Sequence, residues 1–303
     1  MSGAEFLSRP CPGCGSAIAT REVASSPKAE DMGFGGLRSY WSGLFKQKVF
    51  FSYYRCPDCR LLYTPHYFTT NQLGELYADM APNMEVVPTD ALEATQRGYW
   101  DFAKANAPME GGYLEIGPDI GFVARHAATE GRFDHFWLFE PNLAVHPVLA
   151  DAVKGRPHTL SAAMTDLSAV PDGSIGLAFI VHVLDHLLEP KAMLEEILRK
   201  LRPDGALVIV THNEASFLRH AMKTRWPPFC LQHPELYRPS TMQKLVEKAG
   251  FARSRVERSL NYFPLSFMIR QAGFAVGLNL DRLPLPNQRI GLKLGNMITV
   301  AYR

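Results

Sequence analysis

The sequence predicts a doubly wound α/β domain preceded by a small cysteine-rich module, and three observations lead to this prediction. From residue 111 onward, short apolar runs typical of buried strands alternate with amphipathic helical patterns. A glycine-containing turn at 117–121 follows the first of these strands. Four cysteines form two CxxC pairs before residue 60. The alternation favours a mostly parallel sheet with helices on both faces.

The composition is that of an ordinary globular protein. Of the 303 residues, 47% are hydrophobic and 20% are charged, which suffices for a substantial core. The formal net charge of +2 does not point to a nucleic-acid partner, because dedicated nucleic-acid binders carry a basic excess. The N-terminus lacks an apolar secretory segment, and Arg270, Gln271 and Asn279 interrupt the apolar stretch 262–280. We therefore expect a cytoplasmic protein without a membrane span.

The first CxxC pair is Cys11 with Cys14, and the second is Cys56 with Cys59. Thiolates at this spacing bind one tetrahedral zinc ion through a tight turn, and two pairs complete a closed shell of four sulfurs. Two disulfides or two redox pairs are the alternatives, and a reducing compartment disfavours the disulfides. We expect a structural zinc ion, because a closed shell has no open position. Cys230 stands alone and is expected to be a packed thiol.

The chain divides into three expected parts. Residues 1–69 form a zinc-ribbon-like module with strands at 48–54 and 61–63, and bound zinc compensates for its small core. Residues 70–108 have a helical pattern and are expected to bridge the module to the main domain and to cover its ligand cleft. Residues 109–303 form the main domain.

Strands and helices alternate through the first half of the main domain. The expected strands are 113–116, 135–139, 175–183 and 206–210. The expected helices between them are 120–129, 143–153 and 190–201. Pro190 near the first turn and Pro203 beyond the end support the last of these helices.

The turn after the first strand contains Glu115, Gly117, Pro118, Asp119 and Gly121. Open α/β sheets bind nucleotides at such turns, and a pyrophosphate needs a bare backbone where Asp119 stands. S-adenosylmethionine has no phosphate and carries a sulfonium and an ammonium group, so it tolerates carboxylates here. Glu115 is placed to accept a hydrogen bond from that ammonium. An ordinary tight turn with solvated acids is the alternative.

Glu140 follows the second strand, about 20 residues beyond the glycine turn. An acid at this position accepts both ribose hydroxyls of an adenosine. A helix N-terminal acid favoured by the helix dipole is a compatible alternative. The turn and the acid together predict S-adenosylmethionine as the cofactor.

These motifs resemble those of class I S-adenosylmethionine-dependent methyltransferases, and the resemblance covers nearly the whole chain. The segments that carry it are 113–117, 139–142, 166–174, 182–187 and 201–207. The resemblance implies a seven-stranded, mostly parallel Rossmann-like sheet. It also implies an enzyme that transfers a methyl group to an oxygen, nitrogen or carbon nucleophile. The cofactor-binding residues expected from the motifs are Glu115, Gly117, Pro118, Asp119, Gly121, Glu140, Pro141, Met164, Thr165 and His182.

The N-terminal module is similar to the zinc-binding module of a bacterial subset of these enzymes, many of which act on small molecules, sugars or envelope precursors. That subset commonly has Leu-Tyr near the position of Leu76 and Tyr77. The chain departs from the family at several positions. Asp119 replaces a glycine, Ala163 stands where an adenine-side acid is common, Asp185 replaces a glutamate, and His212-Asn213 replaces Pro-Asn.

The acceptor is expected to be a small organic molecule bound over the carboxyl ends of the strands. Methyl transfer needs alignment and exclusion of water, with a base where the acceptor must lose a proton. His233, in an expected free loop, is the first candidate base, and His186 the second, with a structural role as its alternative. Residues 226–229 with Tyr237 are candidates for a lid, and an ordinary packed loop is the alternative.

Two other functions remain open at this stage. One is an RNA-modifying methyltransferase whose zinc module holds RNA through Arg38, Lys46, Lys48 and Arg55. A solvated strand face is the alternative for these cations. The other is a catalytically silent binding protein that keeps the methyltransferase fold.

Overall fold

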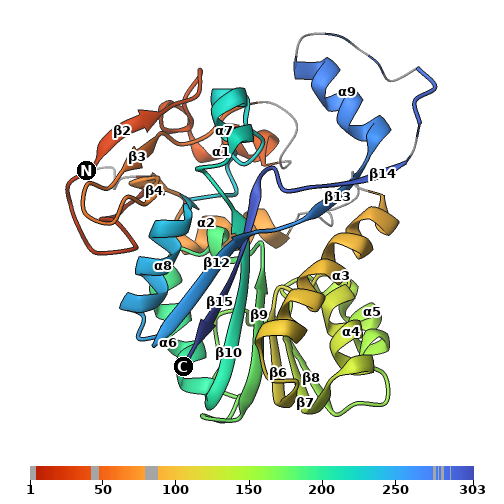
Figure 1. Ribbon diagram of the computed structural model, residues 1–303. Coiled ribbons are helices and arrows are strands. Elements are labelled where there is room, and N and C mark those ends of the chain that lie inside the picture. The colour runs from red at the N-terminus through yellow and green to blue at the C-terminus, as the bar shows by residue number, and fades with distance from the viewer. Residues whose placement is uncertain are drawn as a thin grey trace.

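The computed structural model describes residues 5–41, 48–78, 88–275, 278, 280, 283–286 and 288–303. Its centre is a seven-stranded sheet of strand order β12-β15-β10-β9-β6-β7-β8 (Figure 1). The strands are β6 (Glu110–Ile116), β7 (Arg132–Phe139), β8 (His158–Ser161), β9 (Ile175–Val181), β10 (Leu201–His212), β12 (Arg253–Arg258) and β15 (Asn296–Tyr302).

The strands from β10 to β8 run parallel, and β15 is antiparallel to both of its neighbours. This order and these directions confirm the predicted mostly parallel seven-stranded sheet. The four expected strands of the main domain all lie in it, and their observed bounds differ from the expected ones by a few residues.

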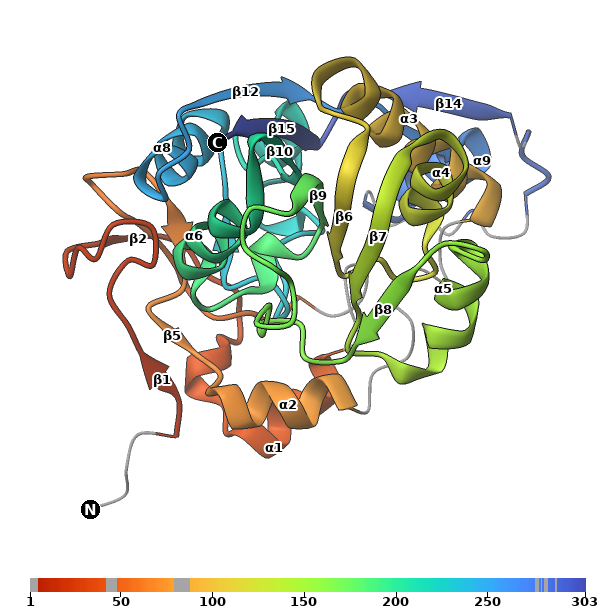
Figure 2. The ribbon, with the colours of Figure 1, turned by 90° about the horizontal axis from the view of Figure 1, so that it is seen from below.

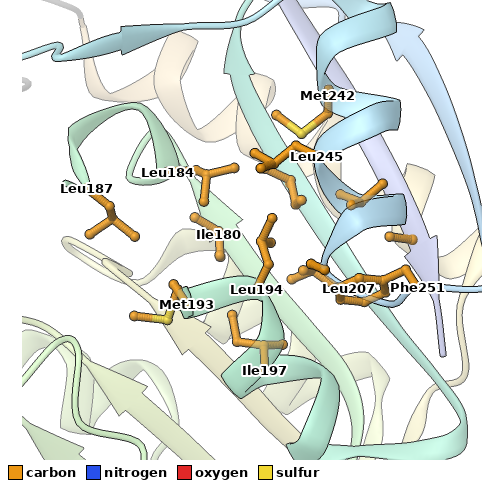
Figure 3. Packing of buried hydrophobic residues seen from close by; sticks show 14 of the residues in the cluster. Ile180, Leu184, Leu187, Met193, Leu194, Ile197, Leu207, Met242, Leu245 and Phe251 are labelled. Carbon is orange, nitrogen blue, oxygen red and sulfur yellow. The ribbon is translucent and has the colours of Figure 1, made fainter. Parts of the chain in front are cut away.

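Helices cover both faces of the sheet, which explains why its central strands are apolar throughout (Figures 1 and 2). One face packs against α3 (Thr89–Asn106), α4 (Phe122–Glu130) and α5 (His146–Ala152). The other face packs against α6 (Pro190–Lys200) and α8 (Pro239–Lys248). Figure 3 shows the second face, where Ile180 and Leu207 meet Leu194 from α6 and Leu245 from α8.

The N-terminal part forms a second, four-stranded antiparallel sheet. It consists of β2 (Thr20–Val23), β3 (Tyr53–Arg55), β4 (Leu62–Tyr63) and β11 (Glu235–Leu236), in the order β11-β4-β3-β2. A strand from the main domain therefore completes the sheet of the module. Only the end of the expected strand 48–54 is a strand, and residues 48–52 are irregular although Phe50 and Phe51 are buried.

Several shorter elements surround the two sheets. They are the strand pair β1 (Leu7–Ser8) and β5 (His66–Tyr67), the pair β13 (Asn261–Pro264) and β14 (Arg289–Leu292), and the helices α1 (Phe34–Leu37), α2 (Thr70–Ala78), α7 (Phe217–Met222) and α9 (Leu265–Ala275). Of the expected bridge 70–108, α2 and α3 are described and 79–87 lies outside the described residues. No helix within the described ranges has the length and apolarity needed to cross a membrane.

Candidate functional site

The turn between β6 and α4 has the backbone shape that its glycines permit. Gly117 and Gly121 have φ values of +68° and +75°, a region that side chains other than glycine's rarely adopt. A Cβ atom on Gly117 would lie 2.3 Å from Cγ2 of Val183, so the turn also needs glycine for space. Asp119 adopts a φ of +51° in the same turn. The turn therefore lies directly against the segment that follows β9.

Glu140 ties this turn to the end of β7. Its Oε2 accepts a hydrogen bond from the backbone N–H of Asp119 at 3.0 Å, and its Oε1 accepts one from the N–H of Asn142 at 2.9 Å. Burial raises the pKa of Glu140 despite these bonds. Because each carboxylate oxygen has a second lone pair, the carboxylate can still accept a pair of ribose hydroxyls.

Glu115 is a buried carboxyl without a cationic partner. Its side chain is 1% exposed and its Oε2 accepts a hydrogen bond from the hydroxyl of Tyr113 at 2.6 Å. Burial raises its pKa to about 7. Among the ion pairs of the described residues, none involves Glu115. A cationic ligand such as the ammonium of S-adenosylmethionine would compensate this carboxylate, so the residues fit the predicted cofactor.

The remaining predicted cofactor residues lie in the loops after β7, β8 and β9. Pro141 and Thr165 are exposed, and Met164 is half-buried against the core. The backbone N–H of Ala163, the residue at the position of the adenine-side acid, donates a hydrogen bond to Oγ of Ser161 at 3.1 Å. His182 directly follows β9 and has a φ of +51°; its neighbour Val183 contacts the glycine turn.

Four histidines gather at the carboxyl ends of β9 and β10. The ring centroids of His182 and His212 are 4.7 Å apart, those of His186 and His233 are 4.7 Å apart, and those of His212 and His233 are 4.9 Å apart. Asp185 lies among them with no exposed surface. The two candidate bases, His233 and His186, therefore share one cluster with His182 and His212.

Two members of this neighbourhood were absent from the sequence prediction. Asn296 in β15 contacts Nδ1 of His212 through Oδ1 at 3.1 Å and Nε2 of His182 through Nδ2 at 3.3 Å. The hydroxyl of Tyr77 in α2 lies 3.0 Å from Nδ1 of His186. Tyr77 had a sequence signal in its pairing with Leu76, whereas Asn296 had none, because only the pairing of β15 with β10 brings it close.

The histidines of the cluster differ in their electrostatic environments. Burial lowers the pKa of His186 to about 3 and also lowers those of His182 and His212, so these rings are neutral at pH 7. Burial acts in the same direction on His233, but the neighbouring Cys230 together with Asp185 outweighs it and raises the pKa of His233 to about 9. The Sγ of Cys230 lies 3.3 Å from Nδ1 of His233. Cys230 is thus more than the isolated packed thiol expected from the sequence.

The loop that carries His233 is not free. His233 is 2% exposed, and its Nδ1 lies 2.8 Å from the carbonyl oxygen of Pro228. Trp226 and Phe229 pack with Phe50 of the N-terminal module instead of standing open as a lid. The expectation of a free loop was therefore wrong, because its aromatic side chains supply the core that the small module lacks.

Two of the four cations proposed as an RNA-binding surface, Lys48 and Arg55, are engaged in internal contacts. Arg55 is 7% exposed and forms ion pairs with Glu22 at 2.8 Å and Glu214 at 2.6 Å. Lys48 donates to the carbonyl oxygens of Trp226, Pro227 and Phe229 at 3.2–3.4 Å. Arg38 pairs with Glu75 at 3.4 Å, and Lys46 lies outside the described residues. Lys48 and Arg55 therefore do not belong to a solvated strand face.

The four cysteines of the two CxxC pairs converge. The Sγ atoms of Cys11 and Cys59 are 3.5 Å apart, those of Cys14 and Cys56 are 3.5 Å apart, and all four lie within 4.8 Å of one another. Four sulfurs around one tetrahedral zinc would be about 3.8 Å apart, given Zn–S bonds of about 2.3 Å. The geometry therefore suits such an ion.

Comparisons with known proteins show the family of this chain. A family model described as a methyltransferase domain matches residues 92–254. No curated protein matches the chain. A chain from the complex that contains the Haloferax volcanii Trm112 methyltransferase activator is similar, with a TM-score of 0.50 and 12% identity over 70% of this chain and 92% of that chain.

Two further solved structures are similar at lower scores. A SAM-dependent methyltransferase from Aquifex aeolicus has a TM-score of 0.49 and 13% identity, over 74% of this chain and 100% of its own. One from Thermotoga maritima has a TM-score of 0.46 and 17% identity, over 70% and 90%. The family model spans more than half of the 303 residues, and its match covers the turn at Gly117 and the acid Glu140. The chain therefore belongs to the S-adenosylmethionine-dependent methyltransferases.

Proposed function

We propose that this enzyme methylates a small organic acceptor at an oxygen, nitrogen or carbon nucleophile. The observation that carries the proposal is the cluster of one buried and three half-buried histidines beside the cofactor turn. S-adenosylmethionine supplies an activated methyl group on its sulfonium, so the protein's tasks are to align the acceptor and exclude water.

The cofactor would lie along the carboxyl ends of β7, β6 and β9. In this proposal Glu115 binds the ammonium and Glu140 the ribose, while Gly117 and Gly121 allow close approach of the backbone. Pro118, Asp119, Pro141, Met164, Thr165 and His182 complete the pocket from the adjoining loops. Asp119 is tolerated because the cofactor carries no phosphate.

An enclosed acceptor site supports a small molecule over a structured RNA. Tyr77 of α2 contacts His186, and β11 joins the module's sheet directly after His233. The module and α2 therefore pack against the cluster. Lys48 and Arg55 are bound to carbonyl and carboxylate groups of the protein. An RNA duplex would have to displace α2 or the module to reach the buried His233.

A base is proposed within this cluster, where the acceptor needs to lose a proton. His233 remains the first candidate, acting through Nε2 because Nδ1 is engaged with Pro228. Because its pKa is raised to about 9, only the neutral fraction of the ring can accept a proton, so turnover through His233 should rise with pH up to about 9. His186 is the second candidate, oriented by the hydroxyl of Tyr77. Both are held in place by packing rather than by a mobile loop, which favours alignment of a nucleophile.

We also propose that residues 1–69 form a zinc module, that 70–108 bridge and cover the site, and that 109–303 are the catalytic domain. Cys11, Cys14, Cys56 and Cys59 would hold a structural zinc ion, in line with their spacing. The cysteines pack with Tyr237 and Leu245 of the main domain, so the ion would fix the N-terminal module to that domain.

The test is a screen of small acceptors with isotope-labelled S-adenosylmethionine, run in parallel with structured RNA. We expect methylation of a small acceptor at a rate that does not depend on salt concentration. Tight, salt-dependent binding of RNA that becomes methylated would favour the RNA-modifying alternative. Cofactor binding without any acceptor, or no cofactor binding in titration, would favour a catalytically silent protein.

A further inference from the structure

We propose a second metal site, for a divalent transition-metal cation, formed by His182, Asp185 and His212. One ligand atom from each of these residues lies within 4.8 Å of the other two. Three ligand atoms about 2.1 Å from one cation are at most about 4.2 Å apart, so small side-chain adjustments would close the site. This site is separate from the cysteine cluster and goes beyond the proposed function.

The first argument is the buried charge of Asp185. The side chain has no exposed surface, and its Oδ1 has no hydrogen-bond partner in the described part of the chain. In that same part, its ion pairs are limited to Nε2 of His212, 3.8 Å from Oδ2. A buried carboxylate is retained where a cation compensates it; the protonated His233 nearby does so in part, and no lysine or arginine pairs with Asp185 among the described residues.

The second argument is the availability of nitrogen lone pairs. Asn296 contacts Nδ1 of His212 through Oδ1 and Nε2 of His182 through Nδ2, so the other ring nitrogens, Nε2 of His212 and Nδ1 of His182, could bind a cation once the proton of His182 moves to Nε2. That nitrogen in His182, Nδ1, is buried and has no partner among the described residues. After a turn of its amide, the oxygen of Asn296 could accept the remaining N–H of both rings, as outer partners of metal-bound histidines do.

The third argument is backbone geometry. His182 adopts a φ of +51°, a conformation that costs about 1–3 kcal/mol for a residue other than glycine. The conformation places the residue between the end of β9 and Val183, which contacts the cofactor turn at Gly117. Strain of this kind persists where the position of the side chain matters.

The donor set indicates the class of cation. Two imidazole nitrogens and one carboxylate suit iron(II), manganese, cobalt, nickel or zinc, whereas magnesium and calcium prefer oxygen ligands. Three protein ligands leave coordination positions open, in contrast to the closed shell of four cysteines. A bound cation would therefore be exchangeable and could bind an oxygen or nitrogen atom of the acceptor.

Manganese(II) tests the site because it binds nitrogen and oxygen ligands in preference to thiolates. We would treat the purified full-length protein with a chelator that leaves the zinc content unchanged, and titrate it with Mn²⁺ under electron paramagnetic resonance. Binding of one Mn²⁺ per chain is expected, with spin-echo modulation from two imidazole nitrogens. No binding, or binding without nitrogen modulation, would overturn the proposal even if every variant failed to fold.

The variants Asp185→Asn and His212→Gln preserve side-chain size and should lower the Mn²⁺ affinity at least about tenfold. The matched controls are Asp134→Asn in β7 and His220→Gln in α7, both exposed, and these should bind Mn²⁺ as the wild type does. Mn²⁺ should raise the melting temperature of the wild type but not that of Asp185→Asn. Unchanged affinity in both site variants would reject the ligand assignment. The titration needs neither cofactor nor acceptor, so its failure would leave the proposed methyl transfer intact.

Discussion

Arg9 and Glu235 form an ion pair of 2.7 Å with 6% and 0% of their side chains exposed, and this pair joins the N-terminal module to the main domain. The same guanidinium donates to the carbonyl oxygens of Thr64, Leu188 and Pro234. One side chain thus ties the module to the loop after the histidine cluster and to β11.

Removing the cation from this pair should destabilise the protein. Burial raises the pKa of Glu235 to about 7, although Arg9 acts in the opposite direction, so the carboxylate is charged at pH 8. Arg9→Met leaves that charge buried and unpaired, and the free energy of unfolding should fall by about 3–5 kcal/mol at pH 8. The unfolded carboxyl titrates near its ordinary value, so the variant should lose stability as the pH rises from 5 to 8. Denaturant titration at several pH values measures this.

The double variant Arg9→Met/Glu235→Leu is the control, because it removes the unpaired charge. It should recover most of the lost stability. If Arg9→Met unfolds like the wild type at pH 8, the pair does not hold the module in place.

The central sheet could be predicted from sequence because its determinants are local. Ile175 to Val181 is a continuous apolar run between turn residues, and such runs identify buried parallel strands without knowledge of their neighbours. The glycine turn and Glu140 were predictable for the same reason, since both follow their strands directly in the chain.

The packing of the module could not be predicted, because it depends on contacts between distant segments. β11 has only two residues, and its pairing with β4 joins Glu235 to Tyr63. Nothing near Trp226 in the sequence indicates that its side chain fills the core of a module far earlier in the chain. The same holds for Asn296, which reaches the histidines only through the register of β15.

The cysteine cluster should bind about one zinc ion per chain that survives mild chelation. Cys56→Ala should lose this ion, because three sulfurs no longer close the tetrahedral shell. Elemental analysis of wild type and variant measures the loss, and Cys230→Ala is the matched control with zinc retained. A zinc content unchanged in Cys56→Ala would remove the assignment. Since the shell has no open position, stability should suffer more than the chemical step.

Glu140 should contribute to cofactor affinity through its ribose contact. Glu140→Ala should weaken binding of S-adenosylmethionine by about 1–3 kcal/mol, the scale of charged hydrogen bonds left unmade. Isothermal calorimetry measures the difference, and Glu247→Ala on the exposed face of α8 should bind as the wild type does. Equal affinities in the two variants would place the ribose elsewhere, and binding of NAD in place of S-adenosylmethionine would overturn the cofactor itself.

Cofactor binding should depend on pH through Glu115. The pKa of this carboxyl is raised to about 7 in the cofactor-free protein, and a bound ammonium would lower it. Binding should therefore release a proton near pH 6.5, and the affinity should rise between pH 5.5 and 7.5. Calorimetry in two buffers of different ionisation enthalpy counts the protons. Glu115→Gln should bind more weakly without proton release, whereas an unchanged release in that variant would assign the proton to another group.

The proposed base can be separated from a structural residue by comparing turnover with cofactor affinity. His233→Gln keeps an amide at the position of the ring, so it can still donate to Pro228, but it cannot accept a proton. If His233 takes a proton from the acceptor, kcat should fall by about 10²–10⁴-fold while the dissociation constant of S-adenosylmethionine stays nearly unchanged.

The histidine His220 in α7 is exposed, and His220→Gln should keep full turnover. A His186→Gln variant run beside it tests the second candidate. Normal turnover by His233→Gln and His186→Gln with the true acceptor would show that the base lies elsewhere or that none is needed. Parallel losses of turnover and cofactor affinity in either variant would indicate a role in packing alone.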